Sequence, residues 1–162
     1  MKKYYSPLIF IAVLSLLSCN KGKKHVFSSD FNSQSDLEQW VFSGDGDATL
    51  EDGILSFTNI ASCYTLEVEN LIDIKKDQSY RVKIRSKHIP SQTGDPGYCV
   101  SNMLVWVRQD SESLLQGNTT AGNDFVEEEF TFTAKTSSPI TLEILIGSIH
   151  GTWIDYISVE RI

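Results

Sequence analysis

Apolar and polar residues alternate along most of this chain, which is the pattern of a β-strand with one buried face. In residues 79–87, Tyr80, Val82 and Ile84 alternate with the basic residues between them. Similar segments, bounded by turn residues, predict further strands over residues 26–31, 54–58, 63–69, 100–108, 126–134, 141–146 and 153–161. About eight strands at this spacing predict an all-β fold, a β-sandwich of the jelly-roll kind.

The connections between these strands are polar and rich in turn residues. Residues 88–97 contain two prolines and two glycines, and residues 110–124 are mostly polar, so we expect both segments to be long loops. Ser35 and Glu38 form a capping-box pattern, which predicts one helical turn over residues 36–40.

The N-terminal segment has the charge pattern of an export signal. Lys2 and Lys3 precede an apolar run over residues 8–17, which is shorter than the roughly 20 apolar residues that a membrane-spanning helix needs. A positive start followed by a short apolar run is typical of a signal peptide.

The apolar run ends in Leu-Leu-Ser-Cys at residues 16–19, which resembles the lipobox of bacterial lipoproteins. In that family the cysteine sulfur carries a diacylglycerol and the signal is cut just before the cysteine, so the resemblance implies a lipid-modified N-terminus at Cys19. It divides the chain into a lipoprotein signal peptide (1–18), a lipidated tether (19–25) and one domain (26–162). It also implies a lipid-anchored place in the bacterial cell envelope, at the periplasmic side of the outer membrane or at the cell surface.

The chain is acidic, with a formal net charge of −7 that becomes more negative once Lys2 and Lys3 leave with the signal. An acidic surface repels phosphate backbones and anionic headgroups. We therefore expect no nucleic-acid partner, and we expect the membrane to be reached through the lipid.

Two cysteines, Cys63 and Cys99, lie within the predicted domain. An exported protein folds in an oxidising compartment, where a disulfide between them is permitted. The alternative is two separate buried thiols, because a free cysteine packs as a small apolar residue. The sequence leaves both possibilities open.

Two segments resemble the jelly-roll carbohydrate-binding modules, which are galactose-binding-like sandwiches. The first runs from Asp-Phe-Asn at residues 30–32 through Trp40 to Leu-Glu-Asp-Gly-Ile-Leu at residues 50–55, and the second is Trp-Ile-Asp-Tyr-Ile-Ser-Val at residues 153–159. The resemblance implies a sandwich over residues 26–162 that binds carbohydrate, with Trp40 in its core. The opening segment also looks like laminin-G and concanavalin-like sandwiches, so that alternative stays open.

Members of this family often hold a structural calcium ion between the first and last strands. The last-strand aspartate of the family matches Asp155, whereas the place of its first-strand glutamate is taken by Asn32, whose amide oxygen carries no charge. Asp30 offers a carboxylate nearby. The resemblance thus implies one calcium ion on Asp155, Asn32 and Asp30; the alternative for Asp155 is a carboxylate that caps loop amides.

A sugar-binding surface needs a flat aromatic ring for the apolar face of a pyranose and polar groups for its hydroxyls. Trp106 lies on the polar face of its predicted strand, with Arg108 beside it on the same face. Tyr98, Trp153 and Arg85 are further candidate ligand-binding residues, if their faces converge with that of Trp106. Because tryptophan in a sandwich usually packs in the core, that alternative stays open for Trp106 and Trp153.

No motif of covalent or metal-assisted catalysis is present: the chain has no Gly-x-Ser-x-Gly, no His-Glu-x-x-His and no phosphate-binding loop. The sequence therefore favours a non-catalytic, lipid-anchored protein that binds a polysaccharide or another glycan. One alternative is a structural or protein-binding sandwich, such as an adhesin or a subunit of an envelope complex. The other is a small concanavalin-like sandwich that hydrolyses a glycan.

Overall fold

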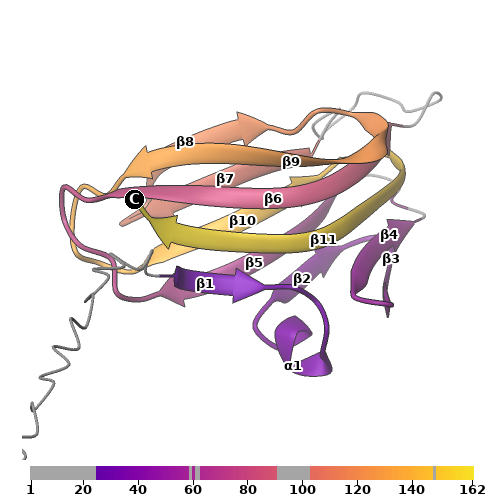
Figure 1. Ribbon diagram of the computed structural model, residues 1–162, viewed down its shortest axis with the longest axis horizontal. Helices are drawn as coiled ribbons and strands as arrows, with labels where there is room; N and C mark the ends of the chain where they lie inside the picture. The colour runs from indigo at the N-terminus through magenta and orange to yellow at the C-terminus, as the bar shows by residue number, and fades with distance from the viewer. Residues whose placement is uncertain (1–24, 59, 61–62, 91–102, 148) are drawn as a thin grey trace, which may run out of the picture.

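The computed structural model describes residues 25–58, 60, 63–90, 103–147 and 149–162. These residues form two antiparallel sheets packed face to face, as Figure 1 shows. The six-stranded sheet contains β1 (His25–Ser29), β3 (Asp47–Glu51), β4 (Ile54–Thr58), β6 (Ser79–Pro90), β9 (Gly122–Thr133) and β11 (Ile149–Arg161). The five-stranded sheet contains β2 (Val41–Gly44), β5 (Tyr64–Leu71), β7 (Met103–Gln109), β8 (Glu112–Asn118) and β10 (Ile140–Ile146). The predicted all-β sandwich is confirmed.

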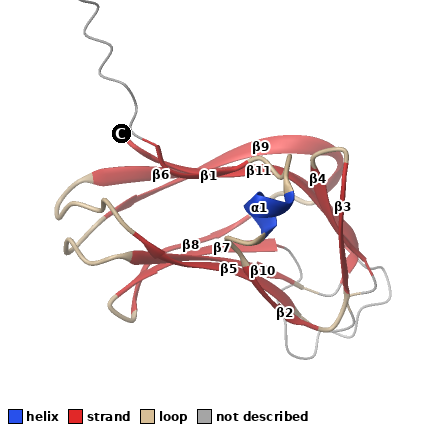
Figure 2. Cartoon of the chain, turned by 90° about the horizontal axis from the view of Figure 1, so that it is seen from below, coloured by secondary structure: helices blue, strands red, loops and turns tan. Residues whose placement is uncertain are grey.

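The strand order brings distant segments of the chain together. The six-stranded sheet runs β3-β4-β11-β6-β9, and β1 pairs with β11 beside this path. The five-stranded sheet runs β2-β5-β10-β7-β8, so β10 lies between two strands that precede it in sequence. The single helical turn, α1 (Gln34–Leu37), lies along the side of the sandwich, between the two layers in the edge-on view of Figure 2. No helix among the described residues is long and apolar enough to cross a membrane.

The alternating pattern predicts the core correctly. Tyr80, Val82 and Ile84 of β6 are fully buried, and so are the apolar residues that alternate along β7 and β10. Trp40 is also buried, as expected, with 5% of its surface exposed, and its ring meets that of Phe27 edge-on at 5.5 Å between centroids. The core therefore lies between the sheets and is supplied by alternate residues of their central strands.

The strand prediction misses β2, β3 and β8, which lie at sheet edges. In β8 only Leu114 and Leu115 are apolar, because a mostly exposed edge strand does not need an alternating pattern. The predicted loop over residues 110–124 is therefore wrong: it forms the β7–β8 turn, β8 and the start of β9. The two edge strands β8 and β9 close one side of the sandwich, where the Phe130 ring occupies the space that a Cβ on Gly117 would take.

Two smaller predictions also need correction. The helical turn covers Gln34–Leu37 instead of residues 36–40, because the carboxylate of Asp36 accepts a hydrogen bond from the Ser33 N–H at 3.1 Å and so fixes the turn earlier. β6 continues to Pro90, into the loop predicted over residues 88–97, since its last residues pair with β11. The rest of that predicted loop lies outside the described residues.

Candidate functional site

The outer face of the five-stranded sheet carries a row of polar and aromatic side chains. Trp106 and Arg108 alternate with the buried Val105 and Val107 along β7, so both point away from the core. In the strand register, Trp106 lies opposite Glu143 of β10, and Glu143 lies opposite Glu67 of β5. The central strands of this sheet thus present an indole, a guanidinium and two carboxylates on one surface.

Arg108 connects these groups. Its Nη2 lies 2.5 Å from Oε2 of Glu143 and 3.6 Å from Oε1 of Glu67. Its guanidinium carbon lies 5.0 Å from the centroid of the Trp106 ring, within the range of a cation–π contact. The indole N–H of Trp106 donates a hydrogen bond to Oγ of Ser113 at 2.8 Å. Both the indole and the guanidinium are therefore held in fixed positions on the surface.

Glu143 is unusual because its carboxylate is almost covered although it belongs to the outer face. Its side chain is 12% exposed. Burial raises the pKa of Glu143, the neighbouring Glu67 raises it further, and the positive charge of Arg108 opposes both effects. Arg108 thus favours the ionised form of a carboxylate whose other surroundings favour the protonated form.

A polar hollow of 250 Å³ adjoins this cluster. It is lined by Glu67, Arg108, Asp110, Ser111, Pro139 and Thr141. Asp110 and Ser111 form the tight β7–β8 turn, both with positive φ angles (50° and 67°). The hollow therefore offers donors and acceptors from three strands and two turns, and its wall residue Arg108 contacts the Trp106 ring.

The structure separates the predicted ligand-binding residues into two groups. Trp106 and Arg108 lie together on the five-stranded sheet, as described above. Trp153 and Arg85 lie on the outer face of the six-stranded sheet, where Trp153 is opposite Lys87 and Arg85 is opposite Tyr156. These two pairs face opposite sides of the sandwich and cannot share one cleft. Tyr98, the fifth predicted residue, lies outside the described residues.

The residues predicted to hold calcium have other partners among the described residues. The carboxylate of Asp155 is paired with the guanidinium of Arg85. The positive charge of Arg85 therefore already balances the carboxylate charge that a calcium ion would need. Asp30 Oδ1 accepts a hydrogen bond from the Asn32 N–H at 3.4 Å, and hydrogen bonds from Asn32 lower the pKa of Asp30. The described residues contain no group of three His, Cys, Asp or Glu side chains that could hold a metal ion. The calcium ion stays a prediction that these contacts do not support.

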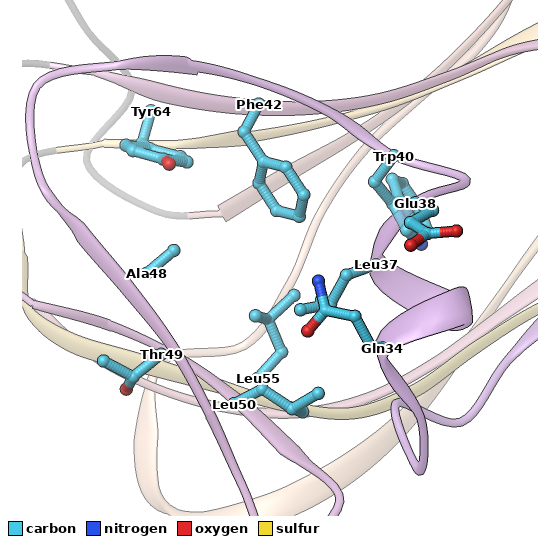
Figure 3. Close-up of a pocket in the computed structure, with 10 residues that line it drawn as sticks. All are labelled: Gln34, Leu37, Glu38, Trp40, Phe42, Ala48, Thr49, Leu50, Leu55 and Tyr64. Atoms are coloured by element: carbon cyan, nitrogen blue, oxygen red, sulfur yellow. The ribbon is translucent and has the colours of Figure 1, made fainter.

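A second hollow, of 390 Å³, opens at the side of the sandwich near α1, as Figure 3 shows. Its walls include Trp40, Phe42, Leu55 and Tyr64, and they are mainly apolar. Tyr64 packs against Phe42 and the core residue Phe57, with ring centroids 6.4 and 5.2 Å apart. This hollow continues the core and offers fewer polar partners to a hydroxyl-rich ligand than the polar hollow does.

Cys63, next to Tyr64 at the start of β5, is disulfide-bonded. Its predicted partner, Cys99, lies outside the described residues, so the pairing of these two cysteines stays a prediction.

The sequence did not reveal Glu143, Glu67 and Ser113 as parts of the site. The available signal was a carboxylate in the middle of the mostly apolar strand β10, because a charged side chain on an inner strand needs a partner. That partner is Arg108, 35 residues earlier in the chain, and only the strand order identifies it.

The comparisons with known proteins concern the fold. No family model and no curated protein matches this chain. Among solved structures, the CBM22-1–GH10 modules of endo-1,4-β-D-xylanase 10B from Clostridium thermocellum, complexed with xylohexaose, match 86% of this chain with a TM-score of 0.61 and 17% identity. This chain covers 29% of that protein.

Two further similar structures are matched by this chain over almost their whole length. The CBM22-1 xylan-binding domain of Paenibacillus barcinonensis Xyn10C matches 86% of this chain and 95% of its own, with a TM-score of 0.58 and 13% identity. The module named BiXyn10A CBM1 matches 85% of this chain and 98% of its own, with a TM-score of 0.61 and 12% identity. In fold, this chain is therefore a β-sandwich of the carbohydrate-binding-module type.

Proposed function

We propose that this chain is a non-catalytic glycan-binding lipoprotein of the bacterial cell envelope, and that the glycan binds on the outer face of the five-stranded sheet. The observation that carries the proposal is the position of Trp106, whose indole lies outside the packed core and contacts Arg108, which lines the polar hollow. The fold shared with carbohydrate-binding modules supports the same conclusion.

The chemistry of the surface suits a pyranose. The apolar C–H face of the ring lies on the indole of Trp106, and the hydroxyls reach Glu67, Arg108 and Asp110 in the adjoining hollow. Arg108 provides a planar fork of donors. Since its contacts with Glu143 and Trp106 already hold it in place, less conformational entropy is lost when a ligand binds.

A binding experiment tests the site. Residues 25–162 contain every described strand and can be produced without the signal. In affinity gels that contain xylan or another neutral polysaccharide, we expect Trp106→Ala to weaken binding by about thirtyfold, the loss typical of a central aromatic anchor. Ile72→Ala, a truncation to alanine of an exposed apolar residue on another part of the chain (68% exposed), should bind like the wild type. Unchanged binding by Trp106→Ala would remove the proposed site.

The anchor is tested separately in the full-length chain. We propose that Cys19 carries the lipid, and two or more acyl chains hold a protein stably at a membrane. In a bacterial host fed a labelled fatty acid, the wild type should incorporate the label and partition with membranes. Cys19→Ser should do neither; incorporation by this variant would contradict the lipoprotein proposal while leaving the glycan site intact.

Hydrolysis of the glycan is a second candidate, because the site holds two facing carboxylates. Glu143 has a raised pKa and lies opposite Glu67, and a glycosidase uses two carboxyl groups, of which the general acid has a raised pKa. Against this role, Arg108 pairs with both carboxylates, and its charge opposes the rise in the pKa of Glu143. Release of reducing ends from a bound polysaccharide that disappears in Glu143→Gln would establish hydrolysis; its absence supports binding alone.

A further inference from the structure

The outer face of the six-stranded sheet carries a second aromatic surface, at the end of the sheet formed by Trp153, Lys87 and Phe125. Nζ of Lys87 lies 4.1 Å from the centroid of the Trp153 ring and 5.7 Å from that of Phe125. The three side chains come from β11, β6 and β9, which are neighbours in the sheet. An ammonium group thus lies between two aromatic rings on one surface.

The Trp153 indole lies over Gly151, two residues earlier on the same strand. A Cβ on Gly151 would lie 2.4 Å from Cη2 of this ring, so only glycine at this position leaves the space that the indole occupies. Gly151 itself is buried beneath it, and Trp153 is half-buried. The ring is therefore held against the sheet, in the position of a platform, and does not extend freely into solvent.

Lys87 differs from the other cations of β6 in lacking a carboxylate partner among the described residues. Arg81 and Lys83 both pair with Glu129, at 3.2 Å, and Arg85 pairs with Asp155. The interactions of Lys87 with described residues are its contacts with these two rings. A cation–π contact leaves the three donors of an ammonium group largely unsatisfied, so, among the described residues, Lys87 is the cation of this strand that is available to an external anion.

We propose that Trp153, Lys87 and Phe125 form a second glycan-binding site, which takes a carboxylate-bearing sugar, that is, a uronic acid unit of an acidic polysaccharide. The carboxylate pairs with Lys87, and the apolar face of the sugar ring lies on the neighbouring aromatic rings. The net negative charge of the chain does not prevent this, because charges farther away than about 8 Å are largely screened at physiological ionic strength. This site faces the opposite side of the sandwich from Trp106 and does not depend on the function proposed for that residue.

The test compares one polysaccharide with and without its charge. Residues 25–162 are titrated with polygalacturonate and with its methyl ester, which keeps the sugar backbone and removes the carboxylate charge. The wild type should bind the acid at least about tenfold more tightly, as expected for one charge-assisted hydrogen bond. Lys87→Met, which keeps an apolar stem, should lose this preference. Lys83→Met is the matched control on the same strand and face, since Glu129 keeps its pair with Arg81.

Several results would overturn the proposed second site. Equal binding of the acid and the ester by the wild type, or an unchanged preference in Lys87→Met, overturns the proposal, as does failure of the wild type to bind any acidic polysaccharide. Trp106→Ala should leave polygalacturonate binding unchanged; if it abolishes that binding, the acid is bound on the five-stranded sheet and the second site does not exist. Thermal unfolding of every variant shows whether a loss reflects binding or folding.

Discussion

Glu143 and Arg108 form an ion pair on the outer face of the five-stranded sheet, with Arg108 Nη2 2.5 Å from Glu143 Oε2. The two side chains are unequally covered, at 12% and 36% exposed. Because burial raises the pKa of Glu143 and Arg108 opposes that effect, the cation of this pair favours the ionised form of a covered carboxylate. The stability of this part of the sheet therefore depends on pH, and the raised pKa fixes the direction of that dependence.

We expect Arg108→Met to destabilise the protein more at neutral pH than in acid. In the folded state the pKa of Glu143 lies above its ordinary value of 4.5, so the folded state binds more protons than the unfolded state in the window above that value. Stability contributed by this group therefore falls as pH rises through the window. Without Arg108 the pKa rises further and the window extends toward neutrality.

The loss for Arg108→Met should be about 1–2 kcal/mol at neutral pH, below the 3–5 kcal/mol of a fully buried pair, because Arg108 is partly solvated. It should shrink as the pH falls well below 4.5, where Glu143 becomes protonated in both states. Chemical denaturation across this pH range measures both values. Adding Glu143→Gln to the variant should remove the extra pH dependence; a loss that is the same at all pH values would contradict the assignment to Glu143.

Gln109 is expected to hold the turn that borders the polar hollow. Its buried amide Nε2 donates to the carbonyl oxygens of Ser138 (2.8 Å) and Thr136 (3.3 Å). Its Oε1 accepts hydrogen bonds from the N–H groups of Lys135 (3.0 Å) and Thr136 (3.2 Å). Gln109→Ala should lower the free energy of unfolding by about 2–3 kcal/mol, because several covered backbone groups lose their partners. It should also weaken neutral-glycan binding, since Pro139 of the same turn lines the hollow.

The matched control for this prediction is Gln116→Ala on β8, where the glutamine is exposed. Urea denaturation of both variants gives the comparison, and we expect a change within about 0.5 kcal/mol for the exposed position. Equal effects at the two positions would show that the hydrogen bonds of Gln109 do not support the turn.

Gly44 should tolerate no side chain. Its φ angle is +127°, and a Cβ would lie 2.3 Å from the carbonyl oxygen of Cys63, a backbone atom that cannot move aside. Gly44→Ala should therefore lower the free energy of unfolding by about 2–3 kcal/mol. Gly122→Ala is the control, because a Cβ added there would meet nothing within 4 Å, and removing a glycine from a strand is neutral or slightly stabilising. Comparable thermal stability of the two variants would contradict the described position of β2 against β5.

The sequence predicts correctly which face of its own strand a residue such as Trp106 occupies. Alternation along residues 100–108 places Trp106 outside the core, and the structure confirms this position. The expectation that Trp40 packs in the core is confirmed in the same way. In both cases the two-residue period and the amphipathic pattern carry the information, because the face of a residue is fixed once its strand is recognised.

The sequence could not predict which residues of different strands lie together on one surface, because this depends on the strand order. Trp153 and Arg85 alternate outward just as Trp106 does, but they belong to the other sheet, and no local pattern states which sheet a strand joins. The pairing of Arg108 with Glu143 likewise requires β10 to lie beside β7. The calcium prediction rested on a family resemblance at Asp155 and took no account of Arg85, which lies on the adjacent strand and pairs with that carboxylate.

Tyr156 should be among the last tyrosines to ionise. Its hydroxyl donates a hydrogen bond to the carboxylate of Glu127. Burial, followed by this hydrogen bond and the negative charge of Glu127, raises the pKa of Tyr156 to about 12, although Arg85 opposes the shift. Since the folded-state pKa lies above the ordinary value of 10.0, stability contributed by this group is lost as pH rises from that value toward about 12.

The ionisation of Tyr156 can be isolated by subtracting the near-ultraviolet titration of Tyr156→Phe from that of the wild type, with circular dichroism recorded in parallel to confirm that both remain folded. Glu127→Gln should shift the isolated midpoint down toward 10.0, because it removes the negative charge that disfavours the phenolate. Glu129→Gln, on the same face of the same strand but paired with Arg81 and Lys83, should leave the midpoint unchanged. A midpoint near 10.0 in the folded wild type would mean that Tyr156 and Glu127 do not make this contact, and the register between β9, β6 and β11 would then need revision.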